Sequence, residues 1–197
     1  KETRRRVRKA ETHNLTFSYF APHELTSSML ESFREIYIST MKRNNAHEAY
    51  YFSHDFFKSM ADELSDRSLV FFVFAEGKAI SCEWVLLSEE TGYAYLGGTL
   101  SEANHMHPNT FLRHKLLPVL GERGIRCYSM GGGLTRNDSL FNYKKSFCRN
   151  SDFLPIHIGK KIHNQEVYDE IVRQWAQRYP DITEKYRNYV LKYRYNS

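Results

Sequence analysis

Two neighbouring lysines stand between aromatic residues in the last third of the chain, in the run Tyr143-Lys144-Lys145-Ser146-Phe147. A lysine ammonium binds a substrate phosphate or stabilises negative charge that develops during a reaction. Tyr143 and Phe147 are four residues apart, so on a helix they share one face and anchor it in the core. The spacing predicts a short helix that presents Lys144, with Lys145 beside it, to an anionic group. A solvated amphipathic helix is the alternative interpretation.

A single carboxylate, Glu83, stands in the largely apolar run 80–87, which has the pattern of a strand. Burial raises the pKa of a carboxyl group, which suits a general base that removes a proton from an amine. The competing interpretation places Glu83 at an edge or outward position, paired with an arginine or lysine. Asp138 is a second candidate base, although the N-cap of a helix is the more ordinary role for it.

Backbone groups at two places are candidates for binding the oxygen atoms of a substrate. Gly97 and Gly98 follow a strand pattern, and glycine lets a backbone approach a ligand closely and present its N–H groups. Asn109 follows Pro108 at the predicted start of a helix, where free N–H groups and the helix dipole favour an anion. A plain turn and ordinary capping are the respective alternatives. The polar and aromatic segment 44–52 is either a lining of the acceptor site or a surface loop.

The cysteines and histidines do not form a metal-binding pattern. Cys82, Cys127 and Cys148 are far apart and include no Cys-x-x-Cys pair. Such usage is typical of a reducing compartment and gives no zinc signature, so we expect a cytoplasmic protein. His105 and His107 are the closest histidine pair, and the sequence offers no third ligand near them. We therefore expect no metal site.

The basic charge of the chain is concentrated at its start. The first nine residues hold six basic side chains and one acidic side chain, which account for the whole formal net charge of +5. The remaining residues are neutral overall, so the charge indicates one short basic segment and no surface for DNA. Apolar residues make up 41% of the chain, enough for a packed core. No apolar run approaches the roughly 18 residues that a membrane span requires.

Hydrophobic periodicity predicts the strands and helices that must position the candidate residues. The strands are expected at 15–20, 69–75, 79–87, 92–97, 125–130 and 153–160. The helices are expected at 4–11, 24–43, 53–64, 108–121, 139–147, 165–178 and 181–194. Tight turns join the second, third and fourth strands into an antiparallel meander, whose first strand is apolar on both faces and should be central or well covered. This order predicts an α/β or α+β domain with a mixed, mostly antiparallel central sheet flanked by helices.

Four short motifs, taken with this element order, resemble one known family. They are Arg5-Arg6-Val7-Arg8-Lys9-Ala10-Glu11, Tyr95-Leu96-Gly97-Gly98, Pro108-Asn109 with Leu112, and Leu140 with Tyr143-Lys144-x-x-Phe147. The first is similar to an "R-x-I-R-K-A" helix end, and the second to a strand that ends in small residues at a cleft. The third and fourth are similar to "P-N-x-x-L" and "L-x-x-F-K-x-x-F". Over residues 1 to about 160 the chain resembles GNAT-fold acyltransferases of the Fem-type branch, the peptidoglycan interpeptide-bridge aminoacyltransferases and their relatives.

The resemblance implies an N-acyl- or aminoacyltransferase that moves an activated acyl group to an amine of a cell-wall or surface-glycan precursor. It implies aminoacyl-tRNA or acyl-CoA as the donor, so tRNA is one expected partner beside the small-molecule or glycan-precursor substrate. The Arg-rich segment lies between two lobes in that branch, which implies that this chain is a second lobe and that a first lobe precedes Lys1. We expect residues 1–160 to form the acyltransferase domain and residues 161–197 to form a helical extension packed on it.

Three departures from the family pattern leave other functions open. Tyr143 stands where the motif has phenylalanine, and the helical hairpin arm thought to meet tRNA is not apparent. The CoA pyrophosphate loop Q/R-x-x-G-x-G/A does not follow Gly98, so the CoA thioester loses more support than the aminoacyl ester. The alternatives are an acyl-CoA-dependent N-acyltransferase for an amino sugar or small amine, and a non-catalytic GNAT-like binding module. The sequence leaves the oligomeric state open.

Overall fold

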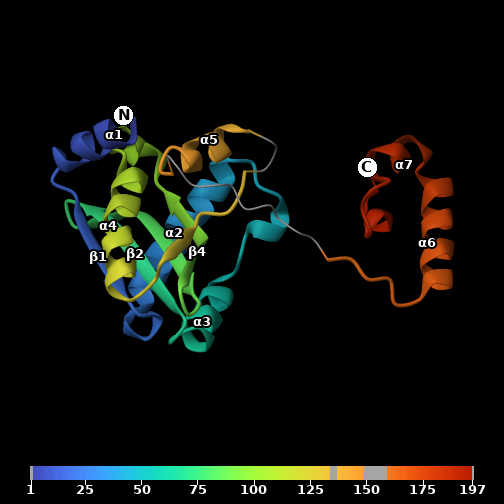
Figure 1. Ribbon diagram of the computed structural model, residues 1–197, viewed down its shortest axis with the longest axis horizontal. Coiled ribbons are helices and arrows are strands. Elements are labelled where there is room, and N and C mark those ends of the chain that lie inside the picture. The colour runs from blue at the N-terminus through green and yellow to red at the C-terminus, as the bar shows by residue number, and fades with distance from the viewer. Residues whose placement is uncertain (1, 134–136, 149–158, 197) are drawn as a thin grey trace. The chain divides into compact units, whose positions relative to one another are not determined.

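The computed structural model describes residues 2–133, 137–148 and 159–196 (Figure 1). The chain divides into two compact units, residues 1–150 and residues 151–197. All of the candidate site residues belong to the first unit. The strand expected at 153–160 falls largely outside the described residues.

The first unit is built on a five-stranded sheet whose spatial order follows the sequence. Its strands are β1 (Thr16–Phe20), β2 (Ser68–Ala75), β3 (Lys78–Leu87), β4 (Thr91–Thr99) and β5 (Cys127–Ser129). The pairs from β1 to β4 are antiparallel, and β5 is parallel to β4. The predicted meander and the mixed, mostly antiparallel sheet are therefore confirmed.

Helices cover both faces of this sheet, as Figure 1 shows for α2 and α4. The helices of the first unit are α1 (Glu2–Glu11), α2 (Ser27–Arg43), α3 (His54–Glu63), α4 (Pro108–Glu122) and α5 (Ser139–Lys145). Short 3-10 helices are present at Pro22–Glu24, Glu48–Tyr50 and Ser101–Met106.

Strand β2 has apolar side chains on both faces because each face packs against a different pair of helices. Phe71 and its alternate neighbours contact the core that α1 and α4 complete. Phe72 points to the opposite face and joins the core formed with α2 and α3. The prediction of a central or well-covered strand at this position is confirmed, since a strand buried on two sides needs a continuous apolar run.

Local capping explains where several helices begin. The hydroxyl of Ser53 accepts a hydrogen bond from the backbone N–H of Phe56 at 3.2 Å, as predicted for a helix starting there. The helix expected from residue 24 begins at Ser27, because Thr26 is its N-cap and the preceding turn is a 3-10 helix. Pro108 occupies the first turn of α4, where its missing N–H costs no hydrogen bond.

The second unit contains α6 (Gln165–Arg178), α7 (Pro180–Tyr186) and a 3-10 helix at Lys192–Arg194. The helix expected at 181–194 ends at Tyr186, because the chain turns back and stacks Tyr195 on that ring with centroids 4.0 Å apart. Buried Trp175 donates its indole N–H to the carbonyl of Tyr195 at 2.6 Å. That residues 161–197 pack on the first unit stays a prediction. None of the described helices combines the length and apolarity needed to cross a membrane.

Candidate active site

Strands β4 and β5 separate shortly after they begin to pair. Their parallel register joins three residue pairs, the last being Tyr93 with Ser129. On the other side of β4, Ala94 lies opposite Val85 and Leu96 lies opposite Trp84, which leaves Tyr95 as a bulge. A bulge increases local twist and bends its strand. Within the described residues, the β4 edge from residue 94 to 99 therefore has no strand partner on the side of β5.

A cavity of about 390 Å³ lies along this free edge of β4. Its walls come from residues 94–99 of β4, the end of α2, the first turns of α4, and α5. Of the predicted site residues, the structure brings six to this one cavity: Glu83, Gly97, Gly98, Asn109, Tyr143 and Lys144. These residues are far apart in the sequence, and in the fold they meet where β4 separates from β5.

Gly97 and Gly98 lie inside β4 and do not form a turn after it. The strand was expected to end near Gly97, but it continues to Thr99. A Cβ on Gly97 would lie 2.6 Å from the carbonyl oxygen of Cys82, and one on Gly98 would collide with Thr40 and with the Ile36 carbonyl at 2.8 Å. Both positions need glycine because α2 and β3 approach the β4 backbone too closely for any side chain.

Glu83 is buried at the centre of the sheet and links three elements. One carboxylate oxygen accepts from the Arg113 guanidinium on α4 at 3.1 Å, and the other accepts a short hydrogen bond from the Tyr128 hydroxyl on β5. Burial raises the pKa of the Glu83 carboxyl, and the charge of Arg113 opposes that shift. Both sequence interpretations are partly met: the carboxyl is buried with a raised pKa, and it is paired with an arginine. The expected edge or outward position is wrong, because β3 is the third of five strands.

Arg113 is a site residue that the sequence reasoning missed. The residue is 8% exposed, and it stands among the apolar residues of α4. Burial lowers the pKa of its guanidinium, but Glu83 and Tyr143 together outweigh this and the net shift is upward. The signal that could have found it is its spacing: Arg113 follows Asn109 by four residues, so both lie on one helix face.

Tyr143 connects α5 to the first turn of α4. Its hydroxyl donates to Asn109 Oδ1 at 2.8 Å and lies 3.4 Å from the hydroxyl of Thr110. Its ring packs edge-on against Phe147, and the Arg113 guanidinium carbon lies 5.3 Å from its centroid. The predicted aromatic pair is therefore in contact, and the Tyr143 hydroxyl has a hydrogen-bonding role that a phenylalanine could not fill.

Lys144 is half-buried in the cavity wall. Its Nζ donates to the carbonyl of Gly132 at 2.6 Å. Burial and the nearby Arg113 charge lower the pKa of Lys144, while Glu83 and Asp138 act in the opposite direction. The lysine thus stands in a partly desolvated, electropositive position, where it stabilises negative charge more strongly than it would in water.

The other predicted residues occupy different positions. Asp138 caps α5 by accepting from the backbone N–H of Phe141 at 2.7 Å, which is the alternative role considered for it. Neither Asp138 nor Lys145 is among the described residues that line the cavity. Among the described residues, Asn44 is the one member of the loop 44–52 that lines the cavity. No three His, Cys, Asp or Glu side chains gather as metal ligands among the residues described.

The end of α2 supplies two further residues that the sequence did not indicate. Thr40 accepts from the backbone N–H of Thr99 at 3.0 Å, and Arg43 donates to the Thr99 carbonyl at 2.8 Å. These bonds attach α2 to the end of β4 and line the cavity with one more cation.

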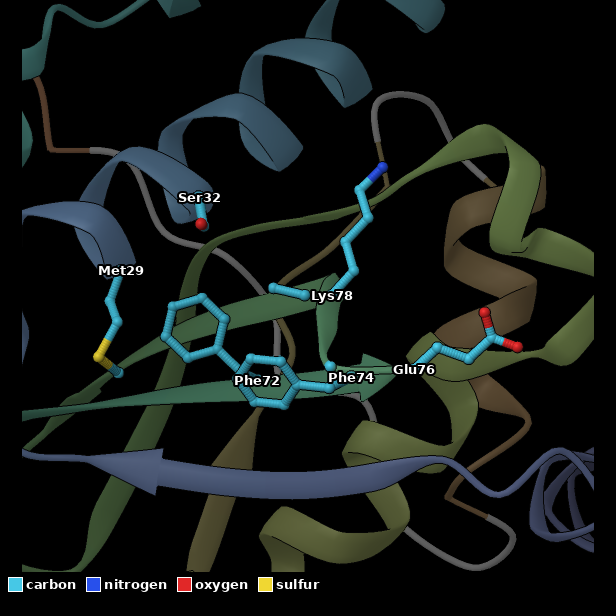
Figure 2. Close-up of a pocket in the computed structure, with 8 residues that line it drawn as sticks. Met29, Ser32, Phe72, Phe74, Glu76 and Lys78 are labelled. Carbon is cyan, nitrogen blue, oxygen red and sulfur yellow. The ribbon is translucent and has the colours of Figure 1, made fainter.

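A second cavity, of about 460 Å³, lies at the turn between β2 and β3 (Figure 2). Met29, Phe72 and Phe74 form its apolar part. Figure 2 shows the charged ends of Glu76 and Lys78 extending away from the aromatic rings. This cavity brings no group of ionisable side chains together, so its larger volume does not make it the better candidate for chemistry.

Comparisons with known proteins agree with the geometry. Residues 1–145 match the family described as acetyltransferase (GNAT) domain. A sequence search among curated proteins finds no match.

Solved structures share the fold at low sequence identity. FemX has a TM-score of 0.61 and 13% identity over 75% of this chain and 52% of its own, so this chain spans about half of FemX. An aminoglycoside acetyltransferase from an uncultured soil metagenomic sample, in complex with sisomicin, has a TM-score of 0.59 and 11% identity over 77% of this chain and 98% of its own. The aminoglycoside N-acetyltransferase AAC(6')-Iy, in complex with CoA, has a TM-score of 0.54 and 12% identity over 77% of this chain and 96% of its own. The family match covers well over half of the sequence, and these structures support the fold. The chain therefore belongs to the acetyltransferase (GNAT) domain family and is an acyltransferase.

Proposed function

We propose that this domain transfers an activated acyl group to an amine of a cell-wall or surface-glycan precursor, as an acyltransferase of the Fem-type branch. One observation carries the proposal: the ammonium of Lys144 faces the same cavity as the edge of β4 that has no strand partner among the described residues. An acyl carbonyl at this edge would receive backbone hydrogen bonds and would lie beside a cation. These are the two sources of stabilisation that a tetrahedral oxyanion requires.

The proposed reaction makes an amide from an amine and an activated carbonyl. The amine nitrogen forms a bond to the carbonyl carbon, and the bond from that carbon to the oxygen or sulfur of the donor breaks. The nitrogen loses one proton, and the departing oxygen or sulfur of the donor gains one. We propose Glu83 as the acceptor of that proton, since it lines the cavity and burial raises its pKa. Each carboxylate oxygen retains a lone pair beyond the bond it already accepts from Arg113 or Tyr128.

The donor distinguishes two versions of this proposal. An aminoacyl ester is favoured by the motifs around Lys144 and by the absence of the CoA pyrophosphate loop after β4, where residues Ser101–Met106 form a 3-10 helix. An acyl-CoA thioester acting with an amino sugar or small amine is the alternative. It is favoured by the likeness of the fold to AAC(6')-Iy, which was solved with CoA.

An assay with defined donors and acceptors tests the proposal. The full-length protein is incubated with acetyl-CoA or aminoacyl-tRNA, together with either a nucleotide-linked cell-wall precursor or a free amino sugar. Mass spectrometry then detects the acylated amine. Acylation of the precursor from aminoacyl-tRNA supports the leading version, and acylation of the amino sugar from acetyl-CoA supports the alternative. Absence of product from every combination contradicts both.

Lys144→Ala should lower turnover by about 10²- to 10³-fold, the usual effect of removing one group that stabilises an oxyanion. The fold should survive, because Lys144 is half-buried and its one described hydrogen bond is to a backbone carbonyl. Lys145→Ala is the matched control, since this neighbour does not line the cavity within the described structure. Turnover of Lys144→Ala within threefold of the control would remove the lysine from the proposed mechanism.

A non-catalytic binding module is not favoured by the site. Such a module would tolerate a cavity filled by side chains, whereas the cavity beside β4 is open and lined by polar groups. The family match to acetyltransferases points in the same direction.

A further inference from the structure

The cavity beside β4 carries more positive than negative charge. Among the described residues that line it, Arg43, Arg113 and Lys144 are cationic and Glu83 alone is anionic. Glu83 is paired with Arg113, whereas Arg43 and Lys144 donate to backbone carbonyls of Thr99 and Gly132. The lining therefore has a formal charge of +2. Arg113 is buried and Lys144 is half-buried, whereas Arg43 is exposed, so an anionic ligand would be stabilised most by the first two cations.

Two donors on one face of α4 have unused hydrogen-bonding capacity. Arg113 Nε is buried and has no hydrogen-bond partner in the described part of the chain. A bidentate arginine–carboxylate pair would use Nε, but the second oxygen of Glu83 is taken by Tyr128. One turn earlier, Asn109 accepts from Tyr143 through Oδ1, and no described residue accepts from its amide N–H groups.

The Tyr143 hydroxyl determines which way the Asn109 amide faces. The phenolic hydroxyl donates to Asn109 Oδ1 at 2.8 Å, and the Thr110 hydroxyl lies 3.4 Å from it. With its oxygen held in this way, the amide must present N–H donors on its other side. A phenylalanine at position 143 would remove this hydrogen bond, and the Asn109 amide could then adopt either orientation. The tyrosine that departs from the family motif thus converts Asn109 into a fixed donor.

We propose that Asn109 and Arg113 form an oxyanion-binding subsite beside Lys144, which holds a phosphate or carboxylate group of the substrate, with Tyr143 as its positioning residue. This rests on the proposed function, since the bound oxyanion belongs to the acyl acceptor or donor. Planar guanidinium and amide donors spaced by one helical turn suit an oxyanion with two or more oxygens. A phosphate of a nucleotide-linked precursor and the free carboxylate of a peptide share this chemistry.

A binding titration tests the subsite without requiring turnover. The 197-residue chain is titrated with inorganic pyrophosphate in one arm and with N-acetylglycine in the other, and backbone and side-chain NMR shifts report the affinity. The stronger ligand identifies the source of the oxyanion. Asn109→Ala should weaken binding by about 3- to 10-fold, as expected for the loss of one hydrogen bond to a charged ligand.

Removing Arg113 alone would leave Glu83 buried without its partner, so the informative variant changes both residues. Glu83→Gln with Arg113→Gln keeps a neutral, hydrogen-bonding pair, and binding should weaken by about 10- to 100-fold. Glu90→Gln with Arg126→Gln neutralises an exposed ion pair outside the cavity and is the charge-matched control. Its affinity should stay within twofold of the parent chain.

The positioning role of Tyr143 has its own readout. Tyr143→Phe should weaken binding by about as much as Asn109→Ala, and combining the two should add nothing further if Tyr143 acts through Asn109. Additive losses would overturn the positioning role. Wild-type affinity of both Asn109→Ala and the paired glutamine variant, or no saturable shift with either probe, would overturn the subsite. Saturable binding that these variants weaken, together with no acyl transfer in any assay, would leave the subsite standing and remove the proposed function.

Discussion

The Glu83–Arg113 pair illustrates how much a buried charge depends on its partner. Both side chains are nearly inaccessible, and each compensates the desolvation of the other. Removing one partner of such a pair lowers the free energy of unfolding by more than the pair contributes to it, because the remaining charge is buried without water or a counter-ion. The tyrosine hydroxyl at the second carboxylate oxygen extends this dependence to β5.

Glu83→Gln should lower the free energy of unfolding by about 3 kcal/mol, since the guanidinium of Arg113 would remain buried and uncompensated. Urea unfolding monitored by fluorescence measures the change. Glu90→Gln is the matched control, because Glu90 pairs with Arg126 at 3.3 Å on the surface and should cost less than about 1 kcal/mol. Equal losses in the two variants would contradict the importance of the buried pair.

The depressed pKa of Lys144 predicts a pH dependence for anion binding. Burial and Arg113 on α4 lower it, whereas Glu83 on β3 and the α5 cap Asp138 raise it. The lysine therefore loses its charge at a pH below the usual value of 10.5. Affinity for pyrophosphate should be full below this depressed pKa and fall as the pH rises through it. Titrations from neutral to alkaline pH measure the midpoint.

Lys144→Arg supplies the control for this midpoint, because an arginine stays charged throughout the accessible range. The affinity of this variant for pyrophosphate should decline at a higher pH than that of the parent chain. Identical profiles for the two proteins would assign the pH dependence to another group.

Because α2 and β4 lie in close contact, one position in β4, Gly98, has no room for a side chain. Gly98→Ala would drive a methyl group into Thr40 and the Ile36 carbonyl, so it should destabilise the fold by about 2 kcal/mol or more and lower activity with it. Gly121→Ala is the contrasting control. That glycine lies within α4 with open space around it, and alanine should stabilise by about 0.5–1 kcal/mol. Thermal unfolding of both variants provides the comparison, and a neutral Gly98→Ala would contradict the packing.

The meander from β2 to β4 was predictable because its turns and alternating apolar residues are local signals. The extension of β4 to Thr99 was not, since two glycines at a strand end resemble a turn unless the approach of α2 is known. Arg113 was overlooked for a similar reason. The role of Arg113 in the site depends on its ion pair with Glu83, which is remote in sequence. Lys144, in contrast, stands between two aromatic residues whose spacing indicates which way the lysine points.

Two apolar cores on opposite faces of one sheet account for the persistence of this fold among distant relatives. TM-scores of 0.54 to 0.61 accompany identities of only 11 to 13%. A core requires apolar volume in the right pattern and tolerates many particular side chains. In the proposal made above, function depends instead on the few residues around the β4 edge, which would allow one architecture to serve different acceptors.

Among the described residues, strand β5 is short: it forms three residue pairs with β4, and its Tyr128 donates to Glu83 and packs against the core. Short, sparsely bonded elements open locally at a lower free energy than the global unfolding of a domain. Amide hydrogens of Tyr128 and Ser129 should therefore exchange with deuterium much faster than those of Phe71 in β2, which mass spectrometry of peptic fragments can measure. Equal protection of the two strands would contradict this. Local opening of β5 would displace Met130, the residue that follows this strand and lines the cavity, so the shape of the cavity would depend on the local stability of β5 while the other four strands stay intact.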